Sequence, residues 1–293
     1  MPEFPGEGNC SCGTSRSASR SRLRLPVRTP ERLDATGTSL AERQKTFDDV
    51  AELYERFRPG YPERLADDVV WLSGIPPRGR ILEIGCGSGK ASTLFAERGY
   101  RMLCLEPGLN LASIAERKLA AFPDARVERR TFEEWQLEDS ALDLVIAAQS
   151  FHYIEPASGL SKVARALRAG GAFAAFANHP ARGNSEVHRR VQEAYARHAP
   201  TLARLDMGAG LEDRIDETGL FETVVMTRYR WQAVYTAAEY VGLMETQSHH
   251  RLLPRGQRAA LLQAIHGAIT GLGGSLTVDY ATRLHLAKRR VTA

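Results

Sequence analysis

The sequence predicts an α/β protein with a parallel β-sheet covered by helices on both faces, and three observations support this prediction. Between residues 81 and 195, five short apolar runs are each followed by a helical pattern, which is typical of a parallel sheet. The first run leads through glycines at alternate positions, Gly85, Gly87 and Gly89, into a helix. Near the end of the chain, residues 276–286 alternate like an antiparallel edge strand.

The composition of the 293 residues is ordinary for a soluble protein, with 43% hydrophobic and 25% charged residues. This length suits one large domain or two small ones, and no apolar run is long enough to cross a membrane. The net charge of +4 is small and the basic residues are dispersed, so charge alone does not indicate a nucleic-acid partner.

The cysteines favour a reducing compartment. Cys86 and Cys104 lie in or beside apolar strands, where a reduced cysteine behaves as a small hydrophobic residue. Cys10 and Cys12 match no zinc spacing, so we expect no metal. A cytoplasmic location fits these thiols best.

Residues 1–38 are rich in Ser, Arg, Gly, Pro and Thr and have almost no apolar periodicity, which predicts a disordered tail. Arginines among serines would suit an organelle transit peptide. However, Pro26 and Pro30 interrupt any amphipathic helix, which favours an artificial extension or translation from an upstream start codon. We expect the ordered domain to cover residues 39–293.

Two helices are expected before the first strand. Apolar residues recur at helical spacing from Phe47 to Tyr54, until Pro59 and Pro62 end the pattern. A second helix is predicted over residues 63–72. The first strand, residues 81–84, then enters the glycine loop, where the absence of Cβ atoms lets the backbone approach a ligand.

The spacing of the glycine loop separates three ligand classes. A phosphate-binding P-loop requires glycine and Ser or Thr where Ile84 and Ala91 stand, and a dinucleotide fingerprint requires glycine in place of Lys90. The remaining pattern, Glu-x-Gly-x-Gly-x-Gly over residues 83–89, resembles motif I of class I S-adenosylmethionine-dependent methyltransferases. The resemblance implies S-adenosylmethionine as cofactor, held by Glu83 together with Gly85 and Gly87.

The same resemblance implies a Rossmann-like, doubly wound sheet of seven strands, mostly parallel with the last strand antiparallel. A strand over residues 223–231 and the final strand would be strands six and seven. A helical cap of about residues 232–274 would lie between them. Its first helix begins with Thr236-Ala-Ala-Glu239, which matches a capping box.

The segment from Tyr54 to Pro62 resembles the Y-x-x-x-R-P-x-Y-P entry of a small-molecule branch of these enzymes, the type 11-like methyltransferases. In that branch the arginine, here Arg58, faces the carboxylate of the methionine part of the cofactor. A guanidinium suits a carboxylate because it donates two parallel hydrogen bonds. We assign Tyr54 to the cofactor and Tyr61 to the acceptor.

Two further segments concern the nucleoside. The second strand, residues 101–105, ends at Glu106-Pro107, where a carboxylate can accept both ribose hydroxyls; a dehydrogenase would share this acid. After a third strand, the stretch from Thr131 resembles the family's adenine-binding loop. By this match the Phe132 N–H meets the adenine, but Thr131 replaces the usual acid, for which Glu133 is an alternative. Trp135 is either a core residue or a ligand contact.

The fourth strand, residues 142–148, leads into Gln149-Ser-Phe-His-Tyr153. Methyltransferases of nucleic-acid bases would show an acid or Asn followed by Pro-Pro and an aromatic residue there, so this segment argues against a DNA substrate. It resembles the small-molecule branch, with Gln149 at the cofactor and Tyr153 at the acceptor. His152 is either a general base or a structural residue that caps the next helix.

The predicted cap carries Thr246-Gln-Ser-His-His250. We assign Ser248 and His249 to the acceptor and His250 to catalysis. Two adjacent histidines without a third ligand are weak evidence for a metal.

Together these features predict methyl transfer from S-adenosylmethionine to an O, N or C nucleophile of a small molecule, without a nucleic-acid or membrane partner. Two alternatives remain open from the sequence. An NAD(P)-dependent oxidoreductase would share the glycine loop and Glu106, and a non-catalytic nucleoside-binding protein would share the whole fold. The sequence leaves the oligomeric state open.

Overall fold

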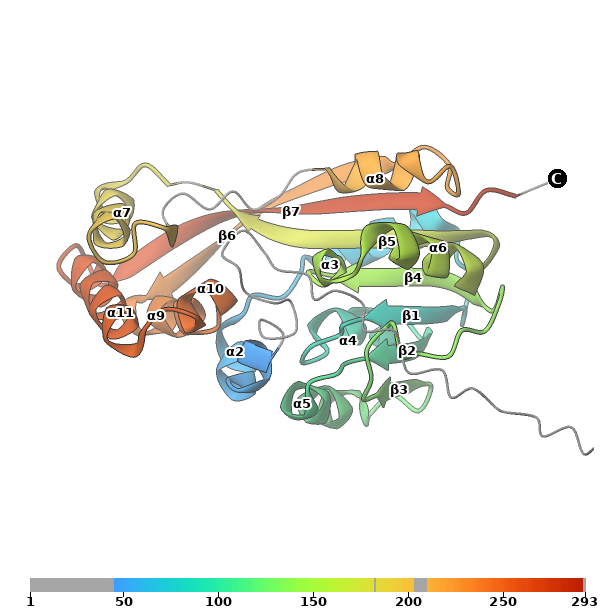
Figure 1. The fold of residues 1–293 in the computed structure, drawn as a ribbon, viewed down its shortest axis with the longest axis horizontal. Helices are drawn as coiled ribbons and strands as arrows, with labels where there is room; N and C mark the ends of the chain where they lie inside the picture. Colours follow the sequence, from blue (N-terminus) through green and yellow to red (C-terminus); the bar gives the residue numbers. More distant parts are fainter. Residues whose placement is uncertain (1–44, 182, 203–209, 292–293) are drawn as a thin grey trace, which may run out of the picture. The chain divides into compact units, whose positions relative to one another are not determined.

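The computed structural model describes residues 45–181, 183–202 and 210–291, so the tail predicted over residues 1–38 lies outside the described residues. The strands form one seven-stranded sheet in the order β3-β2-β1-β4-β5-β7-β6 (Figure 1). Strand β7 is antiparallel to both of its neighbours, and the other strands share one direction. The predicted doubly wound sheet is therefore confirmed. The strands are β1 (Arg80–Ile84), β2 (Arg101–Leu105), β3 (Ala125–Glu128), β4 (Leu142–Ala148), β5 (Leu167–Pro180), β6 (Val225–Thr236) and β7 (Ser275–Lys288).

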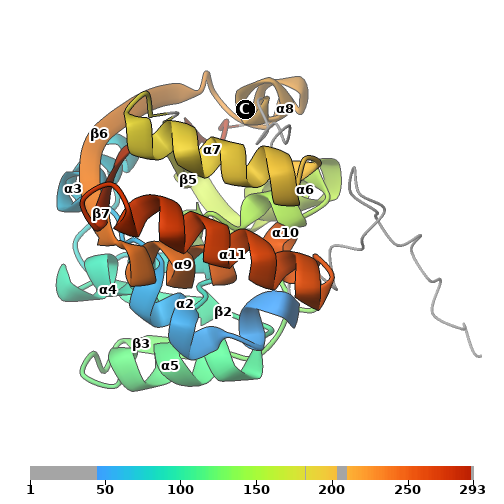
Figure 2. The same ribbon diagram turned by 90° about the vertical axis from the view of Figure 1, so that its left-hand side faces the viewer.

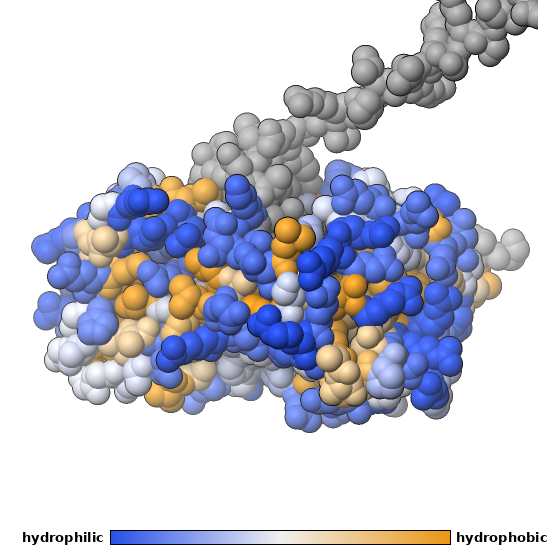
Figure 3. Space-filling view, turned by 90° about the horizontal axis from the view of Figure 1, so that it is seen from below, coloured by the Kyte–Doolittle hydropathy of each residue, from blue (hydrophilic) through white to orange (hydrophobic). Residues whose placement is uncertain are grey.

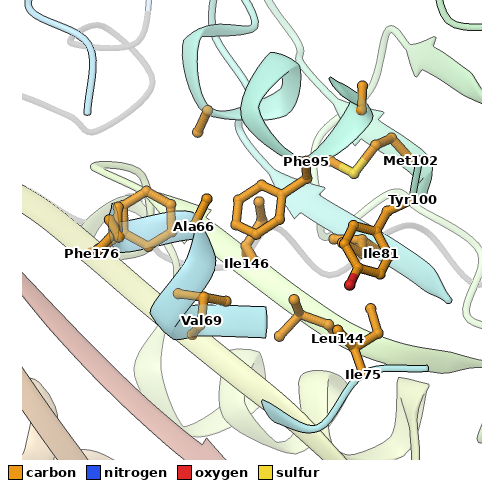
Figure 4. Packing of buried hydrophobic residues seen from close by; sticks show 14 of the residues in the cluster. Ala66, Val69, Ile75, Ile81, Phe95, Tyr100, Met102, Leu144, Ile146 and Phe176 are labelled. Atoms are coloured by element: carbon orange, nitrogen blue, oxygen red, sulfur yellow. The ribbon is translucent and has the colours of Figure 1, made fainter. Parts of the chain in front are cut away.

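Helices cover both faces of this sheet. On one face, α3 (Glu63–Ser73), α4 (Lys90–Glu97) and α5 (Leu109–Leu119) pack on the strands around buried residues such as Phe95 and Ile146 (Figure 4). On the other face, α6 (Pro156–Ala166) and α8 (Leu211–Glu217) enclose a second core. Because both faces are covered, β1 is buried from its second residue to its last, which explains its continuous apolar run.

A third core lies beyond the carboxyl ends of β1 and β4. There the extended ends of β5, β6 and β7 carry α7 (Glu186–His198), α9 (Ala237–Glu245), α10 (Ser248–Arg251) and α11 (Arg255–Thr270). Figure 2 shows α7, α11 and α9 gathered at this end of the molecule. We call α9, α10 and α11, which lie between β6 and β7, the helical insert. The predicted capping box at its start is confirmed, with the Thr236 and Glu239 side chains bonding each other's backbone N–H groups.

Helix α2 (Ala51–Phe57) connects the two parts of the molecule. Ala51 packs against Leu111 and Ile114 of α5, while the other end of α2 contacts α9. The ring of Phe57 fits against Gly242, where a Cβ would lie 2.4 Å from a ring carbon. The first helix of the chain is therefore packed between the strand–helix part and the helical insert.

Several boundaries differ from the sequence prediction. Apolar residues at helical spacing from Leu160 to Leu167 predict a helix that is closed by Gly170-Gly171. In the structure this helix ends at Ala166, because residues from Leu167 onward belong to β5. The apolar run over residues 172–177 predicts the fifth strand, but β5 extends beyond it, since its second half pairs with β7 as far as Pro180. The short helix α8 was not predicted.

No helix in the described segments combines the length and apolar character needed to span a bilayer. The face seen in Figure 3 is mostly hydrophilic where it is drawn in colour, and its apolar residues lie in small separate groups.

Candidate functional site

The glycine loop after β1 forms the floor of a cleft at the carboxyl edge of the sheet. Gly85, Gly87 and Gly89 have φ angles of 64°, 57° and 79°, which L side chains rarely adopt. A Cβ on Gly85 would lie 2.8 Å from the Cβ of Ser150, so glycine is also required there by close approach. The cleft is lined by Tyr54, Arg58, Pro59, Tyr61, Glu83, Gly85, Cys86, Ser88, Lys90, Ala91, Ala148 and Gln149.

Glu106 fixes the conformation of this loop. Its Oε2 accepts the N–H of Gly87 and its Oε1 accepts the N–H of Gly108, both at 2.8 Å. Burial raises the pKa of Glu106 to about 7, although the two backbone hydrogen bonds act in the opposite direction. Each carboxylate oxygen keeps a second lone pair, which could accept a hydroxyl proton.

Glu83 is a fully buried acid with one unsatisfied oxygen. Its Oε2 accepts the Ser92 hydroxyl, while its Oε1 has no hydrogen-bond partner among the described residues. Burial raises the pKa of Glu83 to about 8. A buried oxygen without a partner is costly, so a ligand that donates a hydrogen bond here would stabilise the site.

The turn between α2 and α3 closes the cleft. Asn178 Nδ2 donates to the Gly60 carbonyl at 2.9 Å, and Thr282 Oγ1 donates to Asn178 Oδ1 at 2.6 Å. Tyr61 packs edge-on against Phe176, and its hydroxyl donates to Gln149 Oε1 at 3.4 Å. These contacts hold the Tyr61 side chain next to Gln149, at the end of β4.

Arg58 and Tyr54 enter the cleft from the end of α2. The Tyr54 ring faces Gly87, where a Cβ would be 3.6 Å away from it. The Arg58 guanidinium carbon lies 5.3 Å from the centre of this ring. The structure thus brings together both α2 residues, the glycines and the two acids that the sequence singled out for the cofactor.

The loop after β3 is held by a single lysine. Lys162 Nζ, from α6, donates to the carbonyls of Phe132, Glu133 and Trp135 at 2.6, 3.0 and 2.7 Å. Thr131 and Glu134 bond each other's backbone N–H groups, so the threonine closes a turn in place of the expected acid. Phe132 and Trp135 are buried and stacked, which makes Trp135 a core residue. The Phe132 N–H has no acceptor among the described residues.

Residues 149–153 follow β4 into a short 3-10 turn. Gln149 has a φ of 55°, a strained conformation for a residue with a side chain. His152 is exposed and its ring lies 4.1 Å from that of Tyr153. Tyr153 packs edge-on against Phe47. Pro107 is partly buried at the end of β2.

The remaining candidates lie in the helical insert. Ser248 and His250 of α10 are buried, and His249 is partly buried beside His250. His250 Nε2 is 2.7 Å from the hydroxyl of Tyr195 on α7, while its Nδ1 has no hydrogen-bond partner among the described residues. Burial lowers the pKa of His250 to about 3, so the ring is neutral at physiological pH. These residues do not belong to the lining of the cleft described above.

Sequence reasoning missed the supporting residues. Ser92 lies nine positions after Glu83 on α4, Lys162 reaches the loop from another helix, and Thr246 binds Arg58 from the insert. Helix periodicity could have suggested Ser92, but nothing local marks Lys162 or Thr246. In the described ranges no group of three or more His, Cys, Asp or Glu could hold a metal ion.

Comparison with known proteins identifies the family. A family model described as a methyltransferase domain matches residues 82–175, from β1 into β5. An uncharacterized methyltransferase of Mycobacterium tuberculosis is 28% identical over 243 residues, which is 81% of this chain and 93% of that protein.

Two solved structures share the fold. A protein from Anaeromyxobacter dehalogenans, provisionally described as a type II methyltransferase, has a TM-score of 0.59 and 23% identity over 80% of this chain and all of that chain. A phosphoethanolamine N-methyltransferase of Haemonchus contortus, solved with phosphomonomethylethanolamine and S-adenosylhomocysteine, has a TM-score of 0.52 and 14% identity over 86% of this chain and 60% of that chain.

The prediction of a class I S-adenosylmethionine-dependent methyltransferase is therefore confirmed, with the methyltransferase-domain match over residues 82–175. Neither the oxidoreductase nor the non-catalytic protein considered from the sequence receives support from these relatives.

Proposed function

We propose that this methyltransferase transfers the methyl group of S-adenosylmethionine to an O, N or C nucleophile of a small-molecule acceptor. The observation that carries the proposal is the buried, unpartnered Oε1 of Glu83 in a cleft that also holds Arg58. An unpaired carboxylate oxygen suits the ammonium of the cofactor's methionine part, and a guanidinium suits its carboxylate. One cleft thus offers an acid and a guanidinium for the two ends of an amino acid.

The nucleoside would follow the same edge of the sheet. Glu106 would accept the ribose hydroxyls, with Pro107 beside it, and the Phe132 N–H would meet the adenine. Gln149 and Tyr54 would enclose the sulfur end of the cofactor. Gly85 and Gly87 have no Cβ, so the cofactor could approach the backbone of the loop closely.

The bound cofactor supplies a methyl group on a sulfonium, which is already an excellent leaving group. The chain's contribution would be to align the nucleophile with this methyl group and to exclude water, and such alignment supplies several kcal/mol, up to about 7–11 kcal/mol in the best cases. We place the acceptor between the end of β4 and the helical insert, near Tyr61 and Tyr153, with Ser248 and His249 contributing from α10. The insert would then be the cap predicted from the sequence.

A general base is needed only when the nucleophile must lose a proton. Of the two candidates, we favour His152, because it is accessible at the end of β4. His250 is a weak base with a pKa of about 3 and already contacts Tyr195, so its proposed catalytic role is to orient the acceptor through hydrogen bonds. A kcat–pH profile tests this: His152→Gln should remove a limb that His250→Gln retains.

Charge and cysteine state support the other parts of the proposal. Several basic side chains of the strand–helix part pair with acids, as Arg78 does with Asp124 and Arg98 with Asp67, so this part does not suggest a nucleic-acid surface. Cys86 and Cys104 are free and buried, which suits the reducing cytoplasm.

Calorimetric titration of the chain with S-adenosylmethionine and, separately, with NADH tests the proposal. We expect binding of S-adenosylmethionine that is lost in Gly87→Arg, because a side chain there would strain a φ of 57° and meet Tyr54. A screen of small molecules with a labelled methyl group then identifies the acceptor. Binding of NADH in place of S-adenosylmethionine, or binding without transfer to any acceptor class, would contradict the proposal.

A further inference from the structure

The guanidinium of Arg58 is held along one edge by a single residue of the helical insert. Its Nε donates to Thr246 Oγ1 at 2.8 Å, and its Nη2 donates to the Thr246 carbonyl at 2.9 Å. These two parallel donors form one of the two edges with which a guanidinium can grip a pair of oxygens. The other edge, which includes Nη1, has no acceptor among the described residues, and Arg58 lines the cleft beside Glu83.

The flat faces of the guanidinium also have neighbours. Its central carbon lies 5.3 Å from the ring centre of Tyr54 and 5.7 Å from that of Phe47. Both distances are within the range of cation–π attraction. With one edge and its ring contacts fixed, the open edge is the part of Arg58 left to meet a ligand.

Thr246 is suited to hold this group. It is fully buried at the C-terminal end of α9, and its hydroxyl donates to the Leu243 carbonyl at 2.7 Å. Because that bond uses the hydroxyl proton, the oxygen presents its lone pairs to Arg58. The Thr246 carbonyl belongs to a helix C-terminus, where the backbone dipoles favour a positive charge.

The contact joins two distant parts of the chain. Arg58 and Thr246 are 188 residues apart, and the preceding residue, Phe57, packs on Gly242 one helical turn before Thr246. Phe57, the last residue of α2, and Arg58, which follows it, therefore contact the C-terminal part of α9, the first by packing and the second by hydrogen bonds.

We propose that Thr246 is a positioning residue that aims the open edge of Arg58 at the carboxylate of the cofactor's amino-acid part, so that the helical insert takes part in cofactor recognition. This inference rests on the proposed function, in which Arg58 binds that carboxylate. It adds that the insert contributes to the cofactor site as well as to the acceptor site.

The test compares two ligands that differ in the amino-acid part. S-adenosylhomocysteine contains it, whereas 5′-methylthioadenosine has the same adenosine and thioether but neither carboxylate nor ammonium. Calorimetry on the full chain should show that Thr246→Val binds S-adenosylhomocysteine about tenfold more weakly, the effect of losing one charge-assisted hydrogen bond. Its affinity for 5′-methylthioadenosine should be unchanged. Thr246→Ser keeps the hydroxyl and should bind both ligands like the unsubstituted chain.

A double-mutant cycle completes the test. In an Arg58→Gln background, Thr246→Val should not weaken the binding of S-adenosylhomocysteine further, because Thr246 acts on the ligand through the guanidinium that is already removed. An equal loss of affinity for both ligands, or no loss for either, would overturn the inference. Failure of the unsubstituted chain to bind either ligand would instead refute the proposed function itself.

Discussion

The strand–helix part and the helical insert use their polar residues in different ways. In the strand–helix part, Glu83 and Gly85 line one cleft at the edge of the sheet, and Glu106 accepts the N–H of Gly87 in the loop of this cleft. In the insert, in α7 and in the strands beneath them, polar groups contact one another, as Tyr195 does with His250 and Tyr235 with Tyr280. The residues of the first region suit the chemistry of S-adenosylmethionine. The polar residues of the second region mainly stabilise its own packing, and we propose that the acceptor binds beside them.

Helix α2 connects these two regions. Its start packs on α5 of the strand–helix part, and its end meets α9 through Phe57 and Arg58. The comparison therefore predicts that changes in the cleft abolish cofactor binding, whereas changes at the α2–α9 contact affect stability and the amino-acid end of the cofactor. Four predictions test this division.

The largest effect is expected at Gly85. Gly85→Ala introduces a Cβ that would lie 2.8 Å from the Ser150 Cβ, at a φ of 64°. The loop must shift away from the cofactor, so we expect at least about 100-fold weaker binding of S-adenosylhomocysteine, or about 2.7 kcal/mol. Calorimetry measures this loss.

Gly99→Ala is the matched control. Gly99 also has a positive φ, 79°, but a Cβ there would meet nothing within 4 Å. It should lower stability by about 1–2 kcal/mol through backbone strain and leave cofactor affinity unchanged. Equal binding losses in both variants would show that strain, and not close approach, sets the requirement at Gly85.

The second prediction concerns the contact between the regions. Gly242→Ala would place a Cβ 2.4 Å from the Phe57 ring and should destabilise the fold by about 1–3 kcal/mol through overpacking. Denaturant unfolding measures the change. Gly267→Ala, in α11 with open space around it, should be neutral or stabilise the protein by up to about 1 kcal/mol. If the two substitutions behaved alike, α2 would not be docked on the insert in solution.

The same division explains what could be predicted from the sequence. Strands β1, β2 and β4 were found to within one residue, because burial on both faces imposes a continuous apolar run. The glycines, Glu83 and Glu106 could be singled out because a nucleoside at a sheet edge requires such residues at a fixed spacing, and their assignment to the cofactor stays a prediction. In these cases a short stretch of sequence is enough to reveal the physical requirement, which is burial for the strands and close spacing for the loop.

Long-range contacts explain what could not be predicted. The extra length of β5 depends on pairing with β7, more than a hundred residues away along the chain. Thr246 matters through a residue 188 positions earlier, and Lys162 through carbonyls 27 to 30 positions away. Helix α8 is short and rich in charged residues, so its single buried isoleucine, Ile215, gives no periodic pattern.

The third prediction sharpens the comparison at the adenine end. Lys162→Met removes the three hydrogen bonds that hold the loop of Phe132 and Trp135. We expect about tenfold weaker binding, and the loss should be equal for S-adenosylhomocysteine and 5′-methylthioadenosine because both contain adenine. Arg165→Met on the same helix removes only an exposed ion pair with Asp139 and should change neither affinity. Different losses for the two ligands would place the effect outside the adenine loop.

The smallest expected effect is a change of ligand affinity with pH, and it tests the role of Glu83 alone. Burial raises the pKa of its carboxyl to about 8, so the folded protein without cofactor keeps this proton while the unfolded chain loses it near pH 4.5. Because the folded state binds more protons than the unfolded state between these two pH values, this group makes the ligand-free protein less stable as pH rises from one to the other. An ammonium at Oε1 favours the ionised carboxylate. The affinity for a ligand that carries this ammonium should therefore increase as pH rises.

Affinity for S-adenosylhomocysteine divided by affinity for 5′-methylthioadenosine should therefore rise about fivefold from pH 6 to pH 7.5. The ratio removes the contribution of Glu106, whose pKa of about 7 affects the ribose of both ligands equally. Glu83→Gln cannot ionise and should give a flat ratio over the same range. A rise that persists in this variant would assign the titration to another group, and a flat ratio in the unsubstituted chain would mean that the ammonium does not meet Glu83. A rise that depends on Glu83 would show that the strand–helix part recognises one end of the amino acid by charge, while Thr246 and the insert orient the arginine that recognises the other.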